Sequence, residues 1–267
     1  MSKVIALANQ KGGVGKTTTT INLASNLARR GEKVLVIDLD PQGNTTSGLG
    51  VDKNGLKNST YELLVDDYLV SDCVIELKFE NSKGKRRLNL IPSKVDLAGA
   101  EIEIADFDSK EYLLKDRISG VRKDYDYILI DCPPSLSLLT VNALTTADSV
   151  LIPVQCEYYA LEGLAQLLET IRLVRERLNP SLEIEGLVFT MYDSHTNLSR
   201  QVVEDVKENL DLYIFKQVIP RNVRLAEAPS FGEPVDIFDM KSNGAKAYKK
   251  LAAELVKKNE RKDNPKE

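Results

Sequence analysis

The sequence predicts an α/β fold, with a doubly wound, mostly parallel sheet that carries helices on both faces. The first observation is that apolar, β-branched runs alternate with helix-length patterns along the chain. These runs are nearly continuous rather than alternately apolar and polar, as strands are when both faces of a parallel sheet are buried. The second observation is a glycine-rich turn at residues 11–18, which joins the first run to the first helical pattern. Together they predict strand–helix–strand units wound onto both sides of one sheet.

The apolar runs that predict strands are residues 4–8, 34–38, 88–92, 127–131, 149–154 and 184–190. The patterns that predict helices are residues 17–29, 95–104, 110–121, 138–146, 161–178, 198–210 and 245–257. Residues 52–85 are less regular, and we expect an insertion over the sheet edge there, with a short helix near residues 61–65. We expect one domain over residues 1–258 and a frayed, polar C-terminal tail over residues 259–267.

The composition is that of an ordinary globular protein. The chain has 267 residues, 42% of them hydrophobic, and a formal net charge of −4. Cys73, Cys132 and Cys156 are scattered and His195 is the only histidine, so we expect no disulfide framework, zinc site or Ser–His–Asp triad. No apolar run reaches the ~18–20 residues that span a bilayer. The first strand begins by Val4, so we expect no cleaved signal peptide and a cytoplasmic location.

The glycine-rich turn has the features of a phosphate-binding loop. Its glycines allow backbone N–H groups to surround a phosphate, and the following helix points its positive end at the same place. Lys16 supplies a charge for the β- and γ-phosphates, and the Thr17 hydroxyl is positioned to ligate Mg²⁺. The predicted nucleotide-binding residues of this turn are Lys11, Gly12, Gly13, Val14, Gly15, Lys16, Thr17 and Thr18.

The turn departs from the usual pattern G-x-x-x-x-G-K-[ST] at its first position. Gln10 stands where that pattern has glycine, and a second lysine, Lys11, precedes the paired glycines. A lysine at the mouth of the loop does not easily fold back onto the phosphates that its own loop holds.

Two aspartates at predicted strand ends complete a hydrolytic site. Asp40 lies just beyond the run 34–38, which Pro41 ends. Its carboxylate can accept a hydrogen bond from an attacking water and orient it. Asp131 ends an apolar run in the manner of a Walker B strand, where it would hold Mg²⁺ through a water or through Thr17. The structural alternatives are a solvated Asp-Pro turn for Asp40 and a helix cap for Asp131.

With these motifs in place, the chain resembles the ParA/MinD family of P-loop ATPases with a deviant Walker A loop, most closely its chromosome-partitioning ParA (Soj) members. The resemblance runs from residue 4 to about residue 250. It rests on KGGVGKTTT (11–19), DLDPQGN (38–44), YDYILIDCPPSL (125–136), PVQCEYYALEG (153–163) and IPRNVRLAEAPSFG (219–232). It implies ATP and Mg²⁺ as cofactors and an ATP hydrolysis that is weak alone and stimulated by a partner. It also implies an ATP-bound homodimer, a ParB-type centromere-binding partner and a nucleoid-associated location.

The resemblance further implies roles for individual residues. Lys11 would reach across a nucleotide-sandwich dimer to the partner's phosphates, as an arginine finger does in trans. Gly12 would stay small because that phosphate approaches it closely, Lys16 would serve the nucleotide of its own chain, and Asp40 would position the hydrolytic water. The residues that would frame the adenine are Pro220, Asn222, Glu227 and Pro229.

ParA-type ATP dimers bind double-stranded DNA without sequence preference, and basic side chains are needed for that binding. The candidates are Arg200, Arg221, Arg224, Lys249, Lys250 and His195, with the other lysines of the last helix, Lys246, Lys257 and Lys258. Two alternatives stay open, a local salt bridge from Arg221 or Arg224 to Glu227 or another acid, and a merely solvated last helix. A dimer doubles the number of phosphate contacts, so a chain of net charge −4 can still bind DNA.

One departure from the family pattern concerns DNA binding. Relatives often have arginine in a D-A-R-T-N-L loop, whereas this chain has Asp193-Ser-His195-Thr-Asn-Leu198. Histidine is mostly neutral at pH 7, so weaker or more pH-dependent DNA binding is expected, shared with Arg200. An exposed loop histidine without a role is the alternative.

Three other functions compete with DNA-dependent partition. A MinD-like positioning ATPase would bind membranes through an amphipathic last helix, but residues 245–257 lack Phe and Trp and read as docked on the core, so we expect no membrane partner. An electron-transfer or arsenite-pump relative would need paired cysteines. A binding module without turnover is disfavoured by the intact Asp40 and Thr17.

Overall fold

The computed structural model describes residues 2–79, 86–157 and 160–263. Within them, seven strands form one sheet in the order β3-β4-β2-β5-β1-β6-β7, and all neighbours are parallel except β3 and β4. The strands are β1 (Lys3–Leu7), β2 (Lys33–Asp38), β3 (Ile75–Glu76), β4 (Arg87–Ile91), β5 (Tyr127–Asp131), β6 (Ser149–Gln155) and β7 (Glu183–Thr190). The predicted doubly wound, mostly parallel sheet is therefore confirmed.

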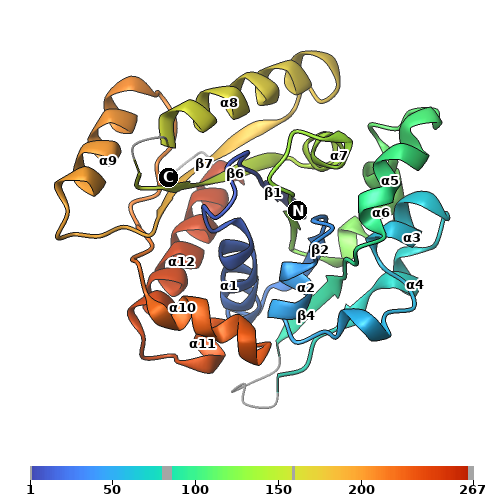
Figure 1. Cartoon of the computed structure of the whole chain (residues 1–267), viewed down its shortest axis with the longest axis horizontal. Coiled ribbons are helices and arrows are strands. Elements are labelled where there is room, and N and C mark those ends of the chain that lie inside the picture. The colour runs from blue at the N-terminus through green and yellow to red at the C-terminus, as the bar shows by residue number, and fades with distance from the viewer. Residues whose placement is uncertain (1, 80–85, 158–159, 264–267) are drawn as a thin grey trace.

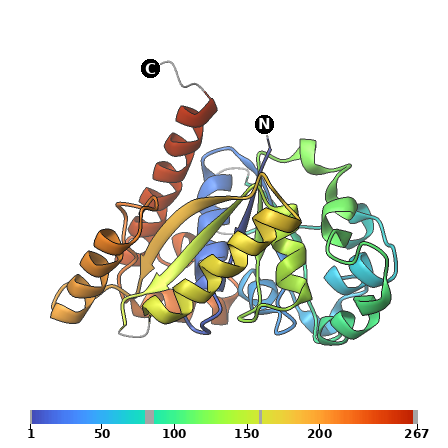
Figure 2. The ribbon, with the colours of Figure 1, turned by 90° about the horizontal axis from the view of Figure 1, so that it is seen from above.

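Helices cover both faces of this sheet (Figures 1 and 2). One face packs mainly against α1 (Lys16–Arg29) and α12 (Asn243–Asp263), which lie side by side. The helices that contribute buried residues to the core on the other face are α3 (Thr60–Val65), α4 (Val70–Cys73), α5 (Leu97–Glu103), α6 (Leu113–Ile118), α7 (Leu138–Thr146), α8 (Ala160–Arg177) and α9 (Asn197–Asn209). The short helices α2 (Asn44–Gly48), α10 (Val223–Glu227) and α11 (Val235–Phe238) lie in the connections.

The parallel register brings functional strand ends together. Asp38 at the end of β2 is paired with Asp131 at the end of β5, and Leu7 of β1 is paired with Asp131 on the other side. The segment that follows β1 therefore leaves the sheet beside both carboxylates. In open α/β sheets this carboxyl edge is where ligands bind.

Several predicted boundaries were wrong. The helix predicted at 110–121 is only α6 (Leu113–Ile118), which begins after a left-handed turn at Ser109 (φ 54°), and the helix predicted at 95–104 is α5 (Leu97–Glu103) followed by one 3₁₀ turn. The short α2, α4, α10 and α11 were not predicted, because elements of four or five residues carry too little periodicity. The helix near 61–65 is confirmed as α3.

The last helix extends further than predicted. α12 runs to Asp263, so residues 259–263 of the predicted tail are helical, and residues 264–267 lie outside the described residues. Leu251, Leu255 and Val256 on α12 are 0–5% exposed and belong to the same core cluster as α1. The described residues include no helix that is both long and apolar enough to cross a membrane.

One buried ion cluster holds α12 to the sheet. Glu185 on β7 has a fully buried side chain, and it pairs with Lys258 of α12 and with Lys3 of β1, 3.6 Å away. The hydroxyl of Ser149 also donates to this carboxylate, at 2.6 Å. Lys258, a candidate for DNA binding by sequence, is therefore engaged in an ion pair with a buried carboxylate of its own chain, and only 11% of its side chain is exposed.

Candidate functional site

The loop between β1 and α1 presents backbone N–H groups at the carboxyl edge of the sheet. Gly13 and Gly15 have φ values of 75° and 87°, a left-handed conformation that L side chains rarely adopt. Gly15 is the N-cap of α1, and no side chain in the described part of the chain caps this helix end. The first N–H groups of α1 therefore remain available for an anion, with the positive end of the helix dipole behind them.

Lys16 lies inside this loop. Its side chain is buried, and its Nζ donates to the backbone carbonyls of Asn9 at 2.9 Å and of Lys11 at 3.3 Å. Burial lowers the pKa of Lys16, and the nearby carboxylates of Asp131 and Asp40 oppose that shift. Within residues 2–79, 86–157 and 160–263, Lys16 forms no salt bridge to a carboxylate, so its charge is well placed to neutralise a phosphate.

Asn9 positions both lysines of the loop, and it was not predicted. Its Oδ1 accepts from the backbone N–H of Lys11 at 3.0 Å, and its Nδ2 donates to the carbonyl of Pro153 on β6 at 2.7 Å. Its own carbonyl accepts from Lys16. An asparagine directly after the apolar run 4–8 and before the glycine-rich turn is the sequence signal that could have identified it.

Asp131 is the centre of a hydroxyl cluster. Its two carboxylate oxygens accept from Thr17 at 2.8 Å, from Thr45 at 2.6 Å and from Thr20 at 3.1 Å. Burial raises the pKa of Asp131, while these hydroxyls and Lys16 favour its charged form. Hydroxyl and carboxylate oxygens are the hard ligands that Mg²⁺ accepts beside phosphates and water, so Thr17 and Asp131 fit a magnesium ion. Among the described residues, no group of three His, Cys, Asp or Glu side chains could hold a metal alone.

Asp38 shapes the floor of the site beside Asp131. It is fully buried, and its Oδ2 accepts from the backbone N–H of Thr46 at 2.8 Å and from its hydroxyl at 2.6 Å. Burial and the neighbouring Asp131 both raise the pKa of Asp38. Thr46 in turn accepts from the N–H of Ser93, so Asp38 holds two loops together. These bonds fix the DLDPQGN segment, to which Asp38 belongs, against the loop at Ser93.

Asp40 is 7% exposed and lies two residues beyond the end of β2. Its Oδ1 accepts from the backbone N–H of Gln42 at 2.9 Å, and its own backbone N–H donates to Oδ1 of Asp38 at 3.3 Å. Gly43 follows with φ 61°, and a Cβ there would meet the Ser93 carbonyl oxygen at 2.8 Å. The carboxylate is therefore held by a tight turn rather than on a solvated loop.

Lys11 extends away from its own loop, unlike Lys16. Its Nζ lies 3.2 Å from Oε2 of Glu157, a residue just after β6, and about a third of the Lys11 side chain is exposed. A Cβ placed at Gly163 on α8 would lie 4.0 Å from the Lys11 Cβ, so the side chain begins beside that helix. Gly12 has ample room on its own chain, since its nearest contact would be the Pro134 Cβ at 4.0 Å.

A pocket of about 120 Å³ lies beside the start of α1. It is lined by Gly15, Thr18, Thr190, Met191, Ile219, Pro220, Arg221, Asn222, Leu225, Ala226 and Tyr248. The structure thus brings Pro220 and Asn222 to the loop. It does not bring Glu227 or Pro229 into the lining, because Glu227 pairs with Arg224 at 2.8 Å and Pro229 faces Gly48. Tyr248, whose hydroxyl is 3.1 Å from Thr19 Oγ1, was not predicted.

The predicted DNA-binding side chains are exposed but differ in their partners. Arg224 is paired with Glu227 and, at 3.4 Å, with Asp239, so the local salt bridge considered from the sequence is present. Arg221 is exposed and has no ion-pair partner among residues 2–79, 86–157 and 160–263. Arg200 donates to the Asn197 side chain at 2.6 Å. The remaining candidates, all exposed, are His195, Lys249 and Lys250.

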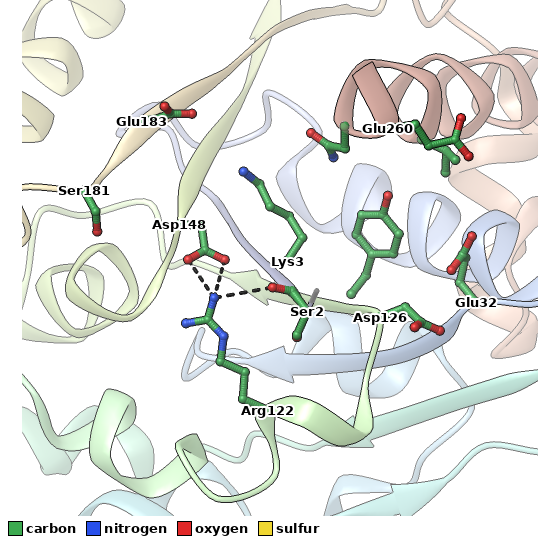
Figure 3. Close-up of a pocket in the computed structure, with 12 residues that line it drawn as sticks. Ser2, Lys3, Glu32, Arg122, Asp126, Asp148, Ser181, Glu183 and Glu260 are labelled. Atoms are coloured by element: carbon green, nitrogen blue, oxygen red, sulfur yellow. Dashed lines mark hydrogen bonds and ion pairs between the residues drawn. The ribbon is translucent and has the colours of Figure 1, made fainter. Parts of the chain in front are cut away.

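A larger pocket, of about 530 Å³, lies at the opposite edge of the sheet (Figure 3). Its lining includes residues at or next to the amino ends of β1, β5, β6 and β7, together with Val256, Asn259 and Glu260 of α12, so it lies away from the phosphate loop. Arg122 bridges this pocket, since its Nη2 lies 2.7 Å from both carboxylate oxygens of Asp148 and 3.4 Å from the Ser2 carbonyl. The larger pocket is therefore separate from the glycine-rich loop and from Asp40 and Asp131.

Comparison with known proteins agrees with this geometry. The family model described as an AAA domain (AAA_31) matches residues 2–184. The chain is 54% identical to the sporulation initiation inhibitor protein Soj of Bacillus subtilis over 256 residues, covering 96% of this chain and 99% of Soj. It is 48% identical to the chromosome partitioning protein ParA of Myxococcus xanthus, covering 100% and 90% of the two chains.

A solved structure supports the fold over the same length. The crystal structure of cobyrinic acid a,c-diamide synthase from Mycobacterium smegmatis with bound ADP and magnesium has a TM-score of 0.83 and 39% identity, covering 96% of this chain and 94% of that one. The phosphate loop, its two lysines and the carboxylates at the strand ends are thus found in a chain that matches partition proteins from end to end. The chain belongs to the ParA/MinD family of P-loop ATPases, in its chromosome-partitioning ParA (Soj) group.

Proposed function

We propose that this protein is an ATP-dependent dimer switch that binds DNA without sequence preference and hydrolyses ATP to drive chromosome or plasmid partition. The observation that carries the proposal is the division between the two lysines of one loop. Lys16 lies inside the loop on two backbone carbonyls, whereas Lys11 extends out of it to a half-exposed carboxylate. A phosphate-binding loop needs one such lysine, so the second is available to a nucleotide held by another protomer.

ATP would be bound by the loop, with Lys16 and the N–H groups at the start of α1 on its phosphates. Thr17 and, through water, Asp131 would hold Mg²⁺, which would neutralise phosphate charge when bound. The pocket beside Thr18, Pro220 and Asn222 would take the base. Glu227 and Pro229 would act on this pocket only indirectly, through α10 and the turn after it.

Asp40 would orient the attacking water. Its carboxylate lies at the carboxyl edge, on a turn that Gly43 makes tight. A positioned carboxylate of this kind contributes by holding a water in line with the terminal phosphate. Hydrolysis would be slow in the isolated protein, because Lys11 of the partner must also reach the phosphates, and a ParB-type protein would accelerate it.

The DNA-binding surface would be made by exposed cations near the nucleotide pocket. Arg221 is the strongest candidate, because it both lines that pocket and lacks an ion-pair partner among the described residues. Arg200, Lys249, Lys250 and His195 would add contacts, and Arg224 would contribute less while Glu227 and Asp239 neutralise it. Dimerisation would double every contact, which strengthens binding without a new residue. Such a protein would be cytoplasmic and associated with the nucleoid.

Membrane association is the weaker proposal. A membrane-binding last helix would present an apolar face to the lipid. The apolar residues of α12, among them Leu251 and Leu255, are instead fully buried against α1. The ion pair from Lys258 to Glu185 also holds this helix to the sheet.

One experiment tests the proposal as a whole. The full chain is measured by size-exclusion chromatography with light scattering, and by retention of non-specific duplex DNA, with ADP, ATP and a slowly hydrolysed ATP analogue. We expect dimers and DNA retention with ATP or the analogue, and neither with ADP. A chain that stays monomeric with the analogue, or retains DNA equally with ADP, contradicts the proposal.

A further inference from the structure

The carboxylate that contacts Lys11 is held in place by its own surroundings. Glu157 uses Oε2 for Lys11 at 3.2 Å and Oε1 to accept from Nε2 of Gln155 at 2.6 Å. The turn after β6 is closed by two backbone bonds, from Glu157 N–H to the Gln155 carbonyl at 2.8 Å and from Cys156 N–H to the Thr190 carbonyl at 3.3 Å. Both oxygens of Glu157 are therefore engaged, and its position is set by the end of a core strand.

The backbone of Lys11 is fixed at the same time. Its N–H donates to Asn9 Oδ1 and its carbonyl accepts from Lys16. The side chain of Lys11 is therefore the part of this residue that can exchange one partner for another. In this structure that partner is Glu157, which balances the charge of Lys11 within one chain.

We propose that Glu157 is a counter-ion that restrains Lys11 within its own protomer and opposes formation of the ATP dimer. This inference rests on the proposed dimer switch. A partner's phosphate can take Lys11 only if the contact with Glu157 is given up. The displaced carboxylate then lies near an incoming phosphate of the same sign, which adds to the cost of association. Glu157 is thus a positioning residue that sets how much ATP-bound protein is needed before dimers form.

The size of the effect follows from the exposure of the pair. The side chains of Lys11 and Glu157 are 34% and 46% exposed. A pair this exposed is typically worth about a threefold change in an equilibrium constant. A symmetric dimer gives up two such contacts, so removing both is expected to tighten the dimer about tenfold.

The test uses Glu157→Gln, which removes the charge but keeps an oxygen for Gln155. The dimer dissociation constant of the full chain is measured by sedimentation velocity with the slowly hydrolysed ATP analogue. We expect it to fall about tenfold, and the difference from wild type to shrink as salt screens the pair. Glu169→Gln is the matched control, because Glu169 is an exposed carboxylate paired with Arg172 on α8, at 2.6 Å. The control should dimerise as wild type does.

A second measurement needs no dimer. In the nucleotide-free chain, Lys11 is labelled with a trace of acetic anhydride, and its reactivity is compared by mass spectrometry with that of exposed Lys249. We expect Glu157→Gln to raise the labelling of Lys11 severalfold, since its amine loses its partner, and Glu169→Gln to leave it unchanged.

The outcomes separate the two proposals. An unchanged or weaker dimer in Glu157→Gln, or unchanged Lys11 labelling, overturns the restraining role while wild-type dimerisation still supports the switch. A wild-type chain that stays monomeric with the analogue overturns the switch and this inference together.

Discussion

Charged side chains such as Asp131 are buried at the carboxyl edge of the sheet, whereas others, such as Arg221, are exposed on the flank formed by α9, α10 and α12. At the edge, Lys16, Asp38 and Asp131 are buried and their polar atoms are bound by hydroxyls and backbone groups. On the flank, Arg221 and Arg224 are exposed, and only Arg224 is neutralised by neighbouring acids. Both regions carry matched family motifs.

This difference in exposure determines what kind of ligand each region suits. A buried charge destabilises the fold unless polar groups are arranged around it, so the arrangement at the edge suits a small anionic ligand. An exposed charge costs little and contributes little, so the flank suits a ligand that is met through many weak, salt-dependent contacts. Substitutions in the two regions should therefore differ in size and in salt dependence.

The largest effect is expected at Asp40. Asp40→Ala should lower ATP hydrolysis by about 10²–10⁴-fold, because the water loses its positioning carboxylate, while ATP binding and the ATP dimer persist. Phosphate release and size-exclusion chromatography with ATP measure the two properties. Asp66→Ala, at an exposed position, should leave both unchanged. Hydrolysis at the wild-type rate in Asp40→Ala contradicts the role.

Lys16→Ala should weaken ATP binding by about 100-fold, since two charge-assisted contacts to phosphate are lost. Isothermal titration calorimetry on the full chain measures the affinity, and circular dichroism checks that the fold is retained. The matched control is Lys11→Ala, which removes the exposed lysine of the same loop. We expect this control to bind ATP as a monomer and to fail to dimerise. Equal losses of affinity in both variants would mean that the two lysines serve one phosphate site.

Two neighbouring lysines of α12, Lys257 and Lys258, allow the effect of an exposed charge and of an ion-paired, mostly buried charge to be compared within one helix. Lys258→Met should lower the free energy of unfolding by about 2 kcal/mol, less than the ~3–5 kcal/mol seen when a buried charge loses its only partner, because Glu185 keeps Lys3 and Ser149. Lys257→Met, at the exposed neighbouring position, should change stability little. Urea unfolding measures both. If only Lys257→Met lowered the free energy of unfolding strongly, Lys258 would not be the lysine that stabilises the fold.

The same pair has a defined pH dependence. Burial alone would raise the pKa of Glu185, but hydrogen bonds from Lys258 and Ser149 and the charge of Lys3 lower it below the ordinary value of 4.5. A carboxyl with a lowered pKa stabilises the fold above its unfolded-state pKa, and this stability is lost as pH falls through the folded-state pKa. The difference between wild type and Lys258→Met should therefore be largest near pH 7 and shrink below pH 4.5.

The smallest effect is expected for single arginines on the flank. Arg221→Ala should weaken DNA retention severalfold and lower the slope of log K against log salt by about 1.8 for a dimer, since each lost phosphate contact contributes about 0.9. Arg224→Ala should have a smaller effect, because Glu227 and Asp239 already neutralise that charge. Fluorescence anisotropy with a labelled duplex across a salt series measures both. A larger loss in Arg224→Ala would show that its ion pairs open on DNA.

Much of the fold was predictable because its main signals are local. Among the strands in the described part of the chain, the continuous apolar runs predicted all except β3, a two-residue strand with too few positions to show a pattern. The phosphate loop, Asp40 and Asp131 were all located from residues adjacent to predicted strand ends. Short helices such as α2 and α10 were missed, because they are fixed by what they pack against rather than by periodicity.

The sequence by itself determined which residues stand at the carboxyl edge, because strand ends and a glycine-rich turn are recognised from residues that are adjacent in the chain. The tertiary structure alone decided which of them are partners. Thr45 reaches Asp131 across 86 positions, and Lys11 reaches Glu157 across 146. It also decided that the Lys258 side chain is only 11% exposed and paired with Glu185, while its neighbour Lys257 is exposed. Periodicity reports which face of an element is buried, but contacts between distant segments depend on how the packed layers bring them together.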